Sequence, residues 1–137
     1  MGDVICQFPV RSIGGETPQT LRLYFDSGSP FTFIRKSATS RFKAILPLPR
    51  PVGFEGLGDG RFSARALLHM EVRLLDFWCR HTAYVVADDV LAADYDVLVG
   101  HDFMQKFNVG LAPKRQDVVL NPASLRLAQT IRRAAAG

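Results

Sequence analysis

One carboxylate, one hydroxyl and one glycine follow each other at Asp26-Ser27-Gly28. Residues 21–25 before them alternate apolar and polar side chains as a half-buried strand does, and residues 31–34 after them are largely apolar. A carboxylate between two buried strands is costly unless it is paired or its pKa is shifted. An acid held in this way can transfer protons, with Gly28 allowing a tight turn around it. The same three residues also favour an ordinary turn at a strand end, so the tripeptide alone leaves both interpretations open.

The length and composition predict one globular domain with a real core, since the chain has 137 residues of which 47% are apolar and 22% charged. No run of about 18 apolar residues suggests a transmembrane helix. The first residues lack a basic region followed by an apolar core, so we expect no signal peptide. Two cysteines are too few for a disulfide framework, and we expect a cytoplasmic protein with reduced thiols.

The residue types outside this motif predict no metal site and no cofactor. Cys79 and His81 lie two apart without further ligands, and the acidic connector at 87–94 lacks the ligand spacing and glycine of a calcium loop. The net charge is +4, and basic residues gather near the C-terminal end at Arg126, Arg132 and Arg133. Nucleic-acid binding would rest on that charge alone. We therefore expect neither a nucleic-acid nor a membrane partner.

The elements that must position the acid are mostly strands. Apolar alternation and turn residues predict strands at 4–11, 20–25, 31–34, 67–75 and 77–86. A short polar helix or turn is expected at 35–42, and Pro47, Pro49 and Pro51 are expected to break regular structure and keep the chain extended. His69 and His81 fall inside strands, and the pattern gives neither a role.

A glycine-rich hairpin is predicted at residues 53–66. Three glycines stand within five residues at its tip, Gly56-Leu57-Gly58-Asp59-Gly60, between two strand-like arms. This pattern fits an ordinary surface hairpin, and it also fits a flap that closes over a groove.

The last third of the chain predicts a buried strand, two helices and a strand pair. Val97-Leu98-Val99 is apolar on both faces, Gly100 ends it, and Asp102 is expected to cap a short helix at 103–107. A strand pair is predicted at 110–120. Asn121 and Pro122 then begin a helix with one apolar face, expected to be formed by Leu127, Ala128, Ile131 and Ala135. That helix could be a solvated tail or cover the edge of a dimer.

Two motifs in this order resemble the paired signatures of the retropepsin-like aspartic proteases, a family of retroviral-type, single-domain enzymes. Asp26-Ser27-Gly28 resembles the active-site signature. About seventy residues later, Val97-Leu98-Val99-Gly100-His101-Asp102-Phe103-Met104 resembles the second signature, apolar-apolar-Gly-Arg-(Asp/Asn)-(Phe/Leu)-Leu. The glycine-rich hairpin lies between them, where the family has its flap. The resemblance covers roughly residues 8–120.

The resemblance implies a mostly all-β fold: a closed acid-protease barrel with a flap hairpin, one short helix after the second motif and a C-terminal helix. The protease domain would span residues 1–120 and a C-terminal helical extension residues 121–137. Asp26 would be the catalytic aspartate, Ser27 would hold the active-site turn across a dimer, and Gly28 would allow the turn near the substrate backbone. Substrate would be bound by the flap tip and by a residue behind the catalytic loop: Gly56, Leu57, Gly58, Asp59, Gly60 and Leu98.

The chemistry of this family requires a second carboxylate. Two carboxylates about 3 Å apart cannot both ionise, so they share a proton and supply both the base and the acid of peptide hydrolysis. The chain contains only one Asp-(Ser/Thr)-Gly and is too short for a two-lobed enzyme. We therefore expect a homodimeric aspartic endopeptidase with C2 symmetry, in which each subunit contributes its Asp26 and the other partner is an extended peptide or protein substrate.

Two departures leave a second interpretation open. His101 stands where the family usually has an arginine that supports the dimer, and Pro30 stands where retroviral enzymes often have an acid that binds substrate backbone. Fold does not guarantee activity, so the alternative is a non-catalytic retropepsin-fold module that dimerises or binds peptides.

Overall fold

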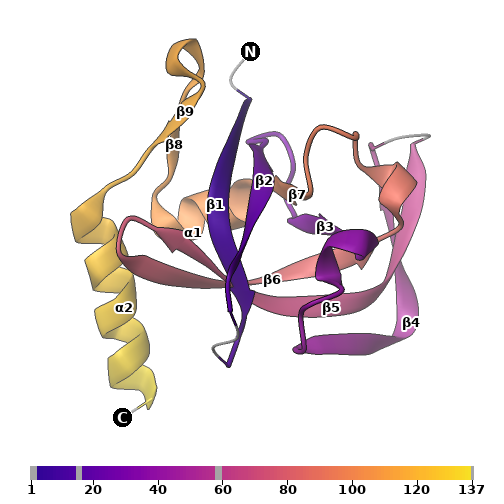
Figure 1. Cartoon of the computed structure of the whole chain (residues 1–137), viewed down its shortest axis with the longest axis horizontal. Coiled ribbons are helices and arrows are strands. Elements are labelled where there is room, and N and C mark those ends of the chain that lie inside the picture. The colour runs from indigo at the N-terminus through magenta and orange to yellow at the C-terminus, as the bar shows by residue number, and fades with distance from the viewer. Residues whose placement is uncertain (1–2, 15–16, 58–59, 137) are drawn as a thin grey trace.

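Six strands close into a barrel in the computed structural model of this chain, which describes residues 3–14, 17–57 and 60–136 and the side chains of these residues up to 129 (Figure 1). In their order around the barrel they are β1 (Val4–Ser12), β2 (Gln19–Phe25), β7 (Val97–Val99), β3 (Phe33–Arg35), β6 (Phe77–Val86) and β5 (Arg61–Leu74). The barrel closes where β1 pairs with β5, with Val10 opposite Val72. The mostly-β closed barrel expected from the sequence is confirmed.

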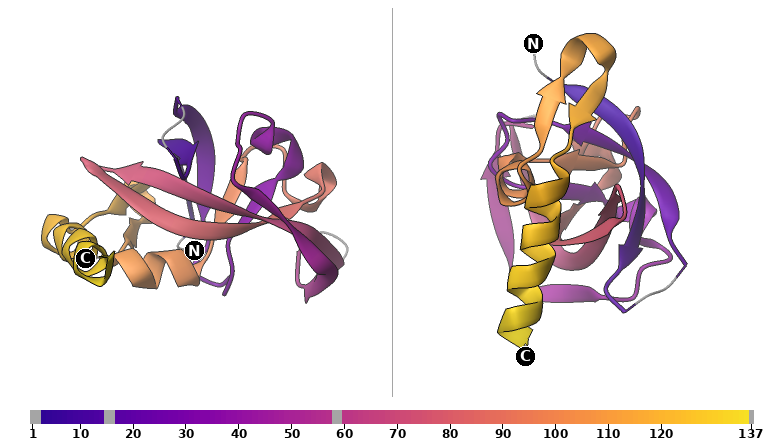
Figure 2. Two further views of the ribbon diagram at one scale, coloured as in Figure 1. Left: turned by 90° about the horizontal axis from the view of Figure 1, so that it is seen from below. Right: turned by 90° about the vertical axis from the view of Figure 1, so that its left-hand side faces the viewer.

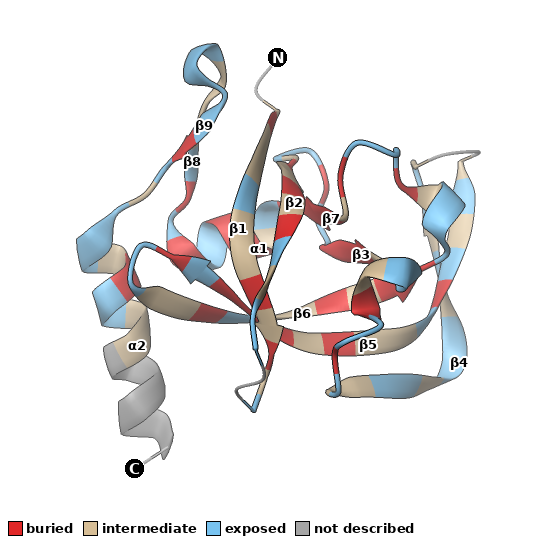
Figure 3. Cartoon of the chain, viewed as in Figure 1, coloured by how far each residue is buried: buried red, intermediate tan, exposed pale blue. Residues whose placement is uncertain are grey.

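The core of the barrel is formed by alternate residues of these strands, as the red segments of Figure 3 show. Leu21, Leu23 and Phe25 of β2 point inward and are buried, which is the alternation that the sequence predicted. Phe103 and Phe107, from the helix after β7, belong to the same larger apolar cluster. A smaller cluster lies toward the flap hairpin and includes Phe33, Tyr95 and Leu98.

The flap hairpin consists of β4 (Ile45–Glu55) and the first part of β5. Among the described strands, β4 pairs with β5 only, so it forms the edge of the sheet. Pro47, Pro49 and Pro51 were expected to break regular structure, but they lie inside β4, where the register shifts between Pro47 and Val52. An edge strand tolerates proline because its missing N–H groups can face solvent.

The connections and the C-terminal part contain three short 3-10 turns, two helices and a separate hairpin. The 3-10 turns are η1 (Lys36–Thr39), η2 (Asp88–Val90) and η3 (Pro113–Arg115), and the helices are α1 (His101–Phe107) and α2 (Pro122–Ala136). The hairpin of β8 (Gly110–Ala112) and β9 (Asp117–Val119) projects beside the start of β1 (Figure 1). None of the described helices is long and apolar enough to span a membrane.

Helix α1 begins earlier than the sequence suggested. Gly100 is its N-cap residue and His101 its first residue, whereas Asp102 was expected to be the cap. The Asp102 carboxylate instead forms hydrogen bonds with Thr32, the residue before β3, and with His81 on β6.

Helix α2 runs along the outside of the barrel and packs against β6 and α1 (Figure 2). Its predicted N-cap is confirmed, because the Ser124 N–H donates to Asn121 Oδ1 at 3.0 Å. The predicted apolar face is shifted: Leu125 is fully buried, whereas the Leu127 side chain is 59% exposed. The first half of the helix is therefore not a solvated tail, while the side chains of Ile131 and Ala135 lie outside the described ones. The expected domain boundary between residues 120 and 121 stays a prediction.

Candidate active site

Asp26 lies at the end of β2, where the chain leaves the barrel in a tight turn. Strand β7 runs parallel to β2 with Val99 opposite Phe25, and the Asp26 N–H continues this ladder by donating to Val99 O at 2.9 Å. The turn is closed by the Ser29 N–H, which donates to Asp26 O at 3.1 Å. The Gly28 N–H donates to the Asp26 carboxylate at 2.9 Å. These bonds fix the half-buried carboxylate at the edge of the barrel.

Gly28 and Ser27 complete this turn and are exposed. A Cβ atom on Gly28 would lie 3.3 Å from Asp26 Oδ1, so a larger residue would press on the carboxylate. The predicted part of Ser27, a hydrogen bond across a dimer, involves a second chain and stays a prediction.

Gly100 of the second motif packs directly beneath the loop that carries Asp26. A Cβ atom there would lie 2.2 Å from Phe31 O and 2.7 Å from Ser29 O, so only glycine fits. The His101 N–H donates to Ser29 O at 2.6 Å. The two motifs, about seventy residues apart, are therefore in backbone contact.

Thr32 and Asp102 join the two motifs through side chains. The Thr32 hydroxyl donates to Asp102 Oδ1 at 2.8 Å and accepts the Gly100 N–H at 3.1 Å. The other carboxylate oxygen of Asp102 lies 2.9 Å from His81 Nε2. Burial acts to raise the pKa of Asp102, but the hydrogen bonds from His81 and Thr32 outweigh it and hold the pKa below its ordinary value. Sequence reasoning missed His81, because one histidine in a strand carries no signal of its partner.

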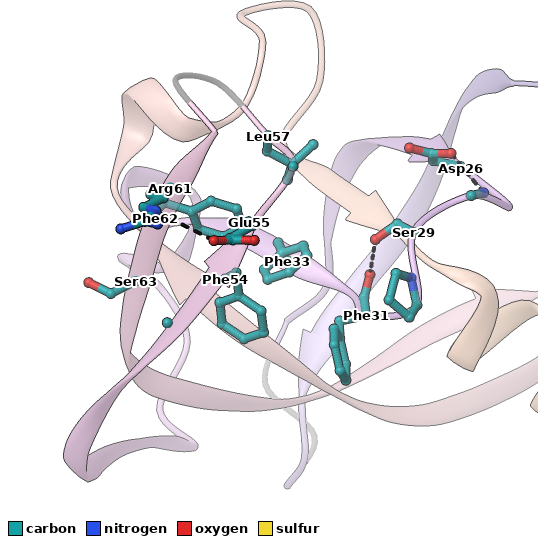
Figure 4. Close-up of a pocket in the computed structure, with 14 residues that line it drawn as sticks. Asp26, Ser29, Phe31, Phe33, Phe54, Glu55, Leu57, Arg61, Phe62 and Ser63 are labelled. Carbon is teal, nitrogen blue, oxygen red and sulfur yellow. Dashed lines mark hydrogen bonds and ion pairs between the residues drawn. The ribbon is translucent and has the colours of Figure 1, made fainter.

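A groove of about 970 Å³ separates the Asp26 loop from the flap hairpin (Figure 4). Its flap side is aromatic: the Phe54 ring lies 4.9 Å from Phe33 and 5.3 Å from Phe62, measured between ring centroids. Phe31, from the loop after Asp26, lies 5.5 Å from Phe54 and is 42% exposed. The groove thus carries a carboxylate at one side and a wall of aromatic rings at the other.

The flap tip is closed by two backbone hydrogen bonds, from the Gly56 N–H to Gly60 O and from the Gly60 N–H to Leu57 O, both 2.9 Å. Gly56 and Gly60 have φ values of +116° and +95°, which favour glycine. Gly56 and Leu57 line the groove and Gly60 is not among the residues that line it, and the contact of these three residues with substrate stays a prediction. Gly58 and Asp59, also expected to bind substrate, lie outside the described residues.

Leu98 lies behind the catalytic loop, where it was expected, but away from the groove. Its side chain has no exposed surface and packs with Phe33 and Tyr95 behind the catalytic loop, so it does not line the groove. The predicted packing behind the loop is present, and the predicted contact of Leu98 with substrate stays a prediction. The reason is that both faces of β7 are covered: Val97 and Val99 belong to the larger apolar cluster, and Leu98 belongs to the smaller one.

Two tyrosines that the sequence did not single out lie near the carboxylate. The Tyr24 hydroxyl donates to Asp3 Oδ2 at 2.6 Å, and its ring centroid lies 4.7 Å from that of Tyr95. The hydrogen bond to Asp3, followed by burial, raises the pKa of Tyr24, and the charge of Asp26 adds to the effect. The pKa of Tyr95 is also raised, in this case mainly by burial. Both phenols stay protonated and can donate hydrogen bonds.

Residues 30 and 101 depart from the family pattern. Pro30 is exposed and lines the groove, and His101 is exposed at the start of α1. Within the described residues, no group of three or more His, Cys, Asp or Glu side chains could hold a metal ion.

No protein-family model matches the chain, and no curated protein matches it in sequence. Solved structures match it in fold. The retroviral protease-like domain of Ddi1 from Leishmania major aligns at a TM-score of 0.57 and 16% identity, over 87% of this chain and 90% of that one. The EIAV protease, solved in complex with the inhibitor HBY-793, aligns at a TM-score of 0.54 and 16% identity, over 76% of this chain and 86% of that one. At such low identity the likeness concerns the fold alone, and the chain has the retropepsin-like fold.

Proposed function

We propose that this chain is an aspartic endopeptidase that works as a C2 homodimer. The observation that carries the proposal is the placement of Asp26 at a groove between a tightly bonded turn and a glycine-tipped hairpin. The EIAV protease, which has the same fold, binds an inhibitor in its solved structure. A groove of this kind suits a peptide in extended conformation.

The need for a dimer follows from the carboxylates at the groove. Of the described residues that line it, Asp26 and Glu55 are acidic, and Glu55 lies on the flap 3.4 Å from Arg61. Hydrolysis by this route needs two carboxylates that share one proton, so that one activates water while the other protonates the carbonyl oxygen. A second Asp26, from the other subunit, would supply the missing carboxylate. The pair would titrate as a unit.

The groove also supports a substrate preference. Phe31, Phe54 and Leu57 line the same groove as Asp26 and offer apolar surface. Burial of apolar side chains there is favourable by about 25 cal/mol per Å². We therefore expect hydrophobic residues beside the scissile bond. Profiling of cleavage sites in a peptide library measures this preference.

The test compares the wild-type chain with Asp26→Asn on an unstructured protein substrate between pH ~4 and ~8. Asp89→Asn is the matched control, because Asp89 is an exposed acid on η2 away from the groove. We expect Asp26→Asn to lower cleavage on the order of a thousandfold or more, as losing an essential catalytic group does. The control should retain full activity.

A mixing experiment tests the shared site separately. Adding excess Asp26→Asn protein to wild type should reduce activity, because heterodimers would hold only one ionisable carboxylate. Sedimentation must show that all variants are dimers. If dimeric wild type cleaves nothing, the protein is the non-catalytic, peptide-binding or dimerising module instead. If Asp26→Asn cleaves as well as wild type, both the site and the mechanism are wrong.

A further inference from the structure

His81 connects the outer wall of the barrel to the second motif. It lies on β6, its side chain is only 11% exposed, and its Nε2 atom is 2.9 Å from Asp102 Oδ2. The ring is also held edge-on against Phe103, with centroids 5.3 Å apart and planes at 87°. The imidazole is therefore fixed both by a hydrogen bond and by packing.

Only one assignment of donors and acceptors fits this network. The pKa of Asp102 is lowered, so its carboxylate is ionised near neutral pH and can only accept hydrogen bonds. His81 Nε2 and the Thr32 hydroxyl must then both donate to it. With its proton committed to Asp102, the Thr32 oxygen accepts the buried Gly100 N–H.

The last link reaches the loop that bears Asp26. Gly100 is in contact with Ser29 O and Phe31 O, and the next residue donates its N–H to Ser29 O at 2.6 Å. Without Asp102 as its acceptor, the Thr32 hydroxyl would no longer hold its rotamer, and a change of rotamer would move its oxygen away from the Gly100 N–H. The position of the loop therefore depends on which way the Asp102 carboxylate is turned.

We propose that His81 is a positioning residue, which orients Asp102 and through Thr32 and Gly100 fixes the loop that carries Asp26. This inference rests on the proposed function as far as catalysis is concerned. The Phe103 N–H and Thr32 already occupy Oδ1 of Asp102, both at 2.8 Å. The bond from His81 holds the second oxygen and so prevents rotation of the carboxylate.

The experiment uses two substitutions of this residue in the full chain. His81→Leu removes the N–H donor and replaces the imidazole with an apolar side chain of similar size. His81→Gln keeps an N–H near the position of Nε2. The matched control is His69→Leu. His69 is a part-buried histidine on the neighbouring strand β5 and makes one side-chain bond, to Thr82 at 3.0 Å, away from both motifs.

Amide hydrogen exchange of Gly100 and Ser29 is the first readout, because it does not depend on activity. In His81→Leu we expect exchange at these amides to speed up about tenfold, the effect of losing a charge-assisted hydrogen bond. His81→Gln should restore most of the protection of these amides. In His69→Leu the exchange rates of both amides should change by no more than the loss of its global stability accounts for. Protection at Gly100 that is equal in wild type and His81→Leu would overturn the proposal.

Steady-state kinetics is the second readout. We expect His81→Leu to lower kcat about tenfold with little change in KM, since the flap and the aromatic wall are untouched, and His81→Gln to recover the rate. A loss that His81→Gln does not rescue, or an equal loss in His69→Leu, would mean that His81 only stabilises the fold. If the wild type cleaves no substrate, the proposed function fails, while the exchange measurement still decides the positioning role.

Discussion

Replacing Gly100 with alanine tests the contact that holds the second motif against the catalytic loop. Gly100 has φ −91° and ψ −177°, an extended conformation that alanine adopts without strain. The substitution therefore adds one methyl group without straining the backbone at residue 100. Any loss of stability must come from the space in which that methyl group is placed.

The magnitude follows from the distances at this site. The new Cβ atom would lie 2.2 Å from Phe31 O, whereas ordinary contacts begin at 3.4 Å, so the loop must move by about 1.2 Å. Such a shift breaks the bonds from His101 N–H to Ser29 O and from Gly100 N–H to Thr32. Overpacking of about 1–3 kcal/mol and two hydrogen bonds of about 1 kcal/mol each give a loss of about 3–5 kcal/mol.

Urea denaturation followed by circular dichroism measures this loss. The matched control is Gly53→Ala in β4, because a Cβ atom at Gly53 meets nothing within 4 Å. We expect the control to change the free energy of unfolding by less than about 1 kcal/mol, in the stabilising direction, since alanine reduces the entropy of the unfolded chain. In thermal melts Gly100→Ala should lower Tm by about 10 °C or more.

A Gly100→Ala protein as stable as Gly53→Ala would refute this reasoning. It would mean that the catalytic loop and the second motif are not in close backbone contact. The two motifs would then have to contact each other through other residues.

Two further predictions concern Asp96 and helix α2. Burial acts to raise the pKa of Asp96, but hydrogen bonds and charge from Arg22, joined by the charge of Arg35, outweigh it and lower the pKa. Since the folded pKa lies below the unfolded value of about 3.9, the stabilisation is complete above that pH and is lost as pH falls through the folded value. The difference in unfolding free energy between wild type and Asp96→Asn should therefore narrow below pH ~4, and a constant difference would contradict this. In α2, Leu125→Ala should lower the free energy of unfolding by about 2–5 kcal/mol, because Leu125 is fully buried. Leu127→Ala should lower it by less than about 0.5 kcal/mol. Urea denaturation measures both losses, and equal small values would mean that the helix does not pack against the barrel.

The order and type of most elements could be predicted because they have a local signal, whereas the prolines of β4 hid the first half of that strand. Alternating side chains mark β2, an apolar run marks β7, and glycines with positive φ mark the flap tip. The proximity of Asp26 to Gly100 could be predicted only from the resemblance, since nothing in either segment alone says that β2 and β7 pair in parallel.

The missed features depend on contacts between distant segments. In helix α2 the spacing of the apolar residues favoured a face with Leu127, and only docking on the barrel buries Leu125 instead. The partners of His81 and Tyr24, which are Asp102 and Asp3, lie 21 residues away in each case. No periodicity connects such pairs, so their hydrogen bonds could be found only from the packed structure.

The prolines of β4 have a consequence for how the protein behaves at high concentration. An unpaired edge strand is a template on which a second chain can add, and repeated addition leads to cross-β aggregates. Strand β4 exposes Leu46, which is 49% accessible and would favour such stacking. Yet Pro47, Pro49 and Pro51 remove three N–H donors within five residues, so an incoming strand could not form a continuous ladder. The hairpin can therefore keep an apolar outer edge while resisting fibril growth.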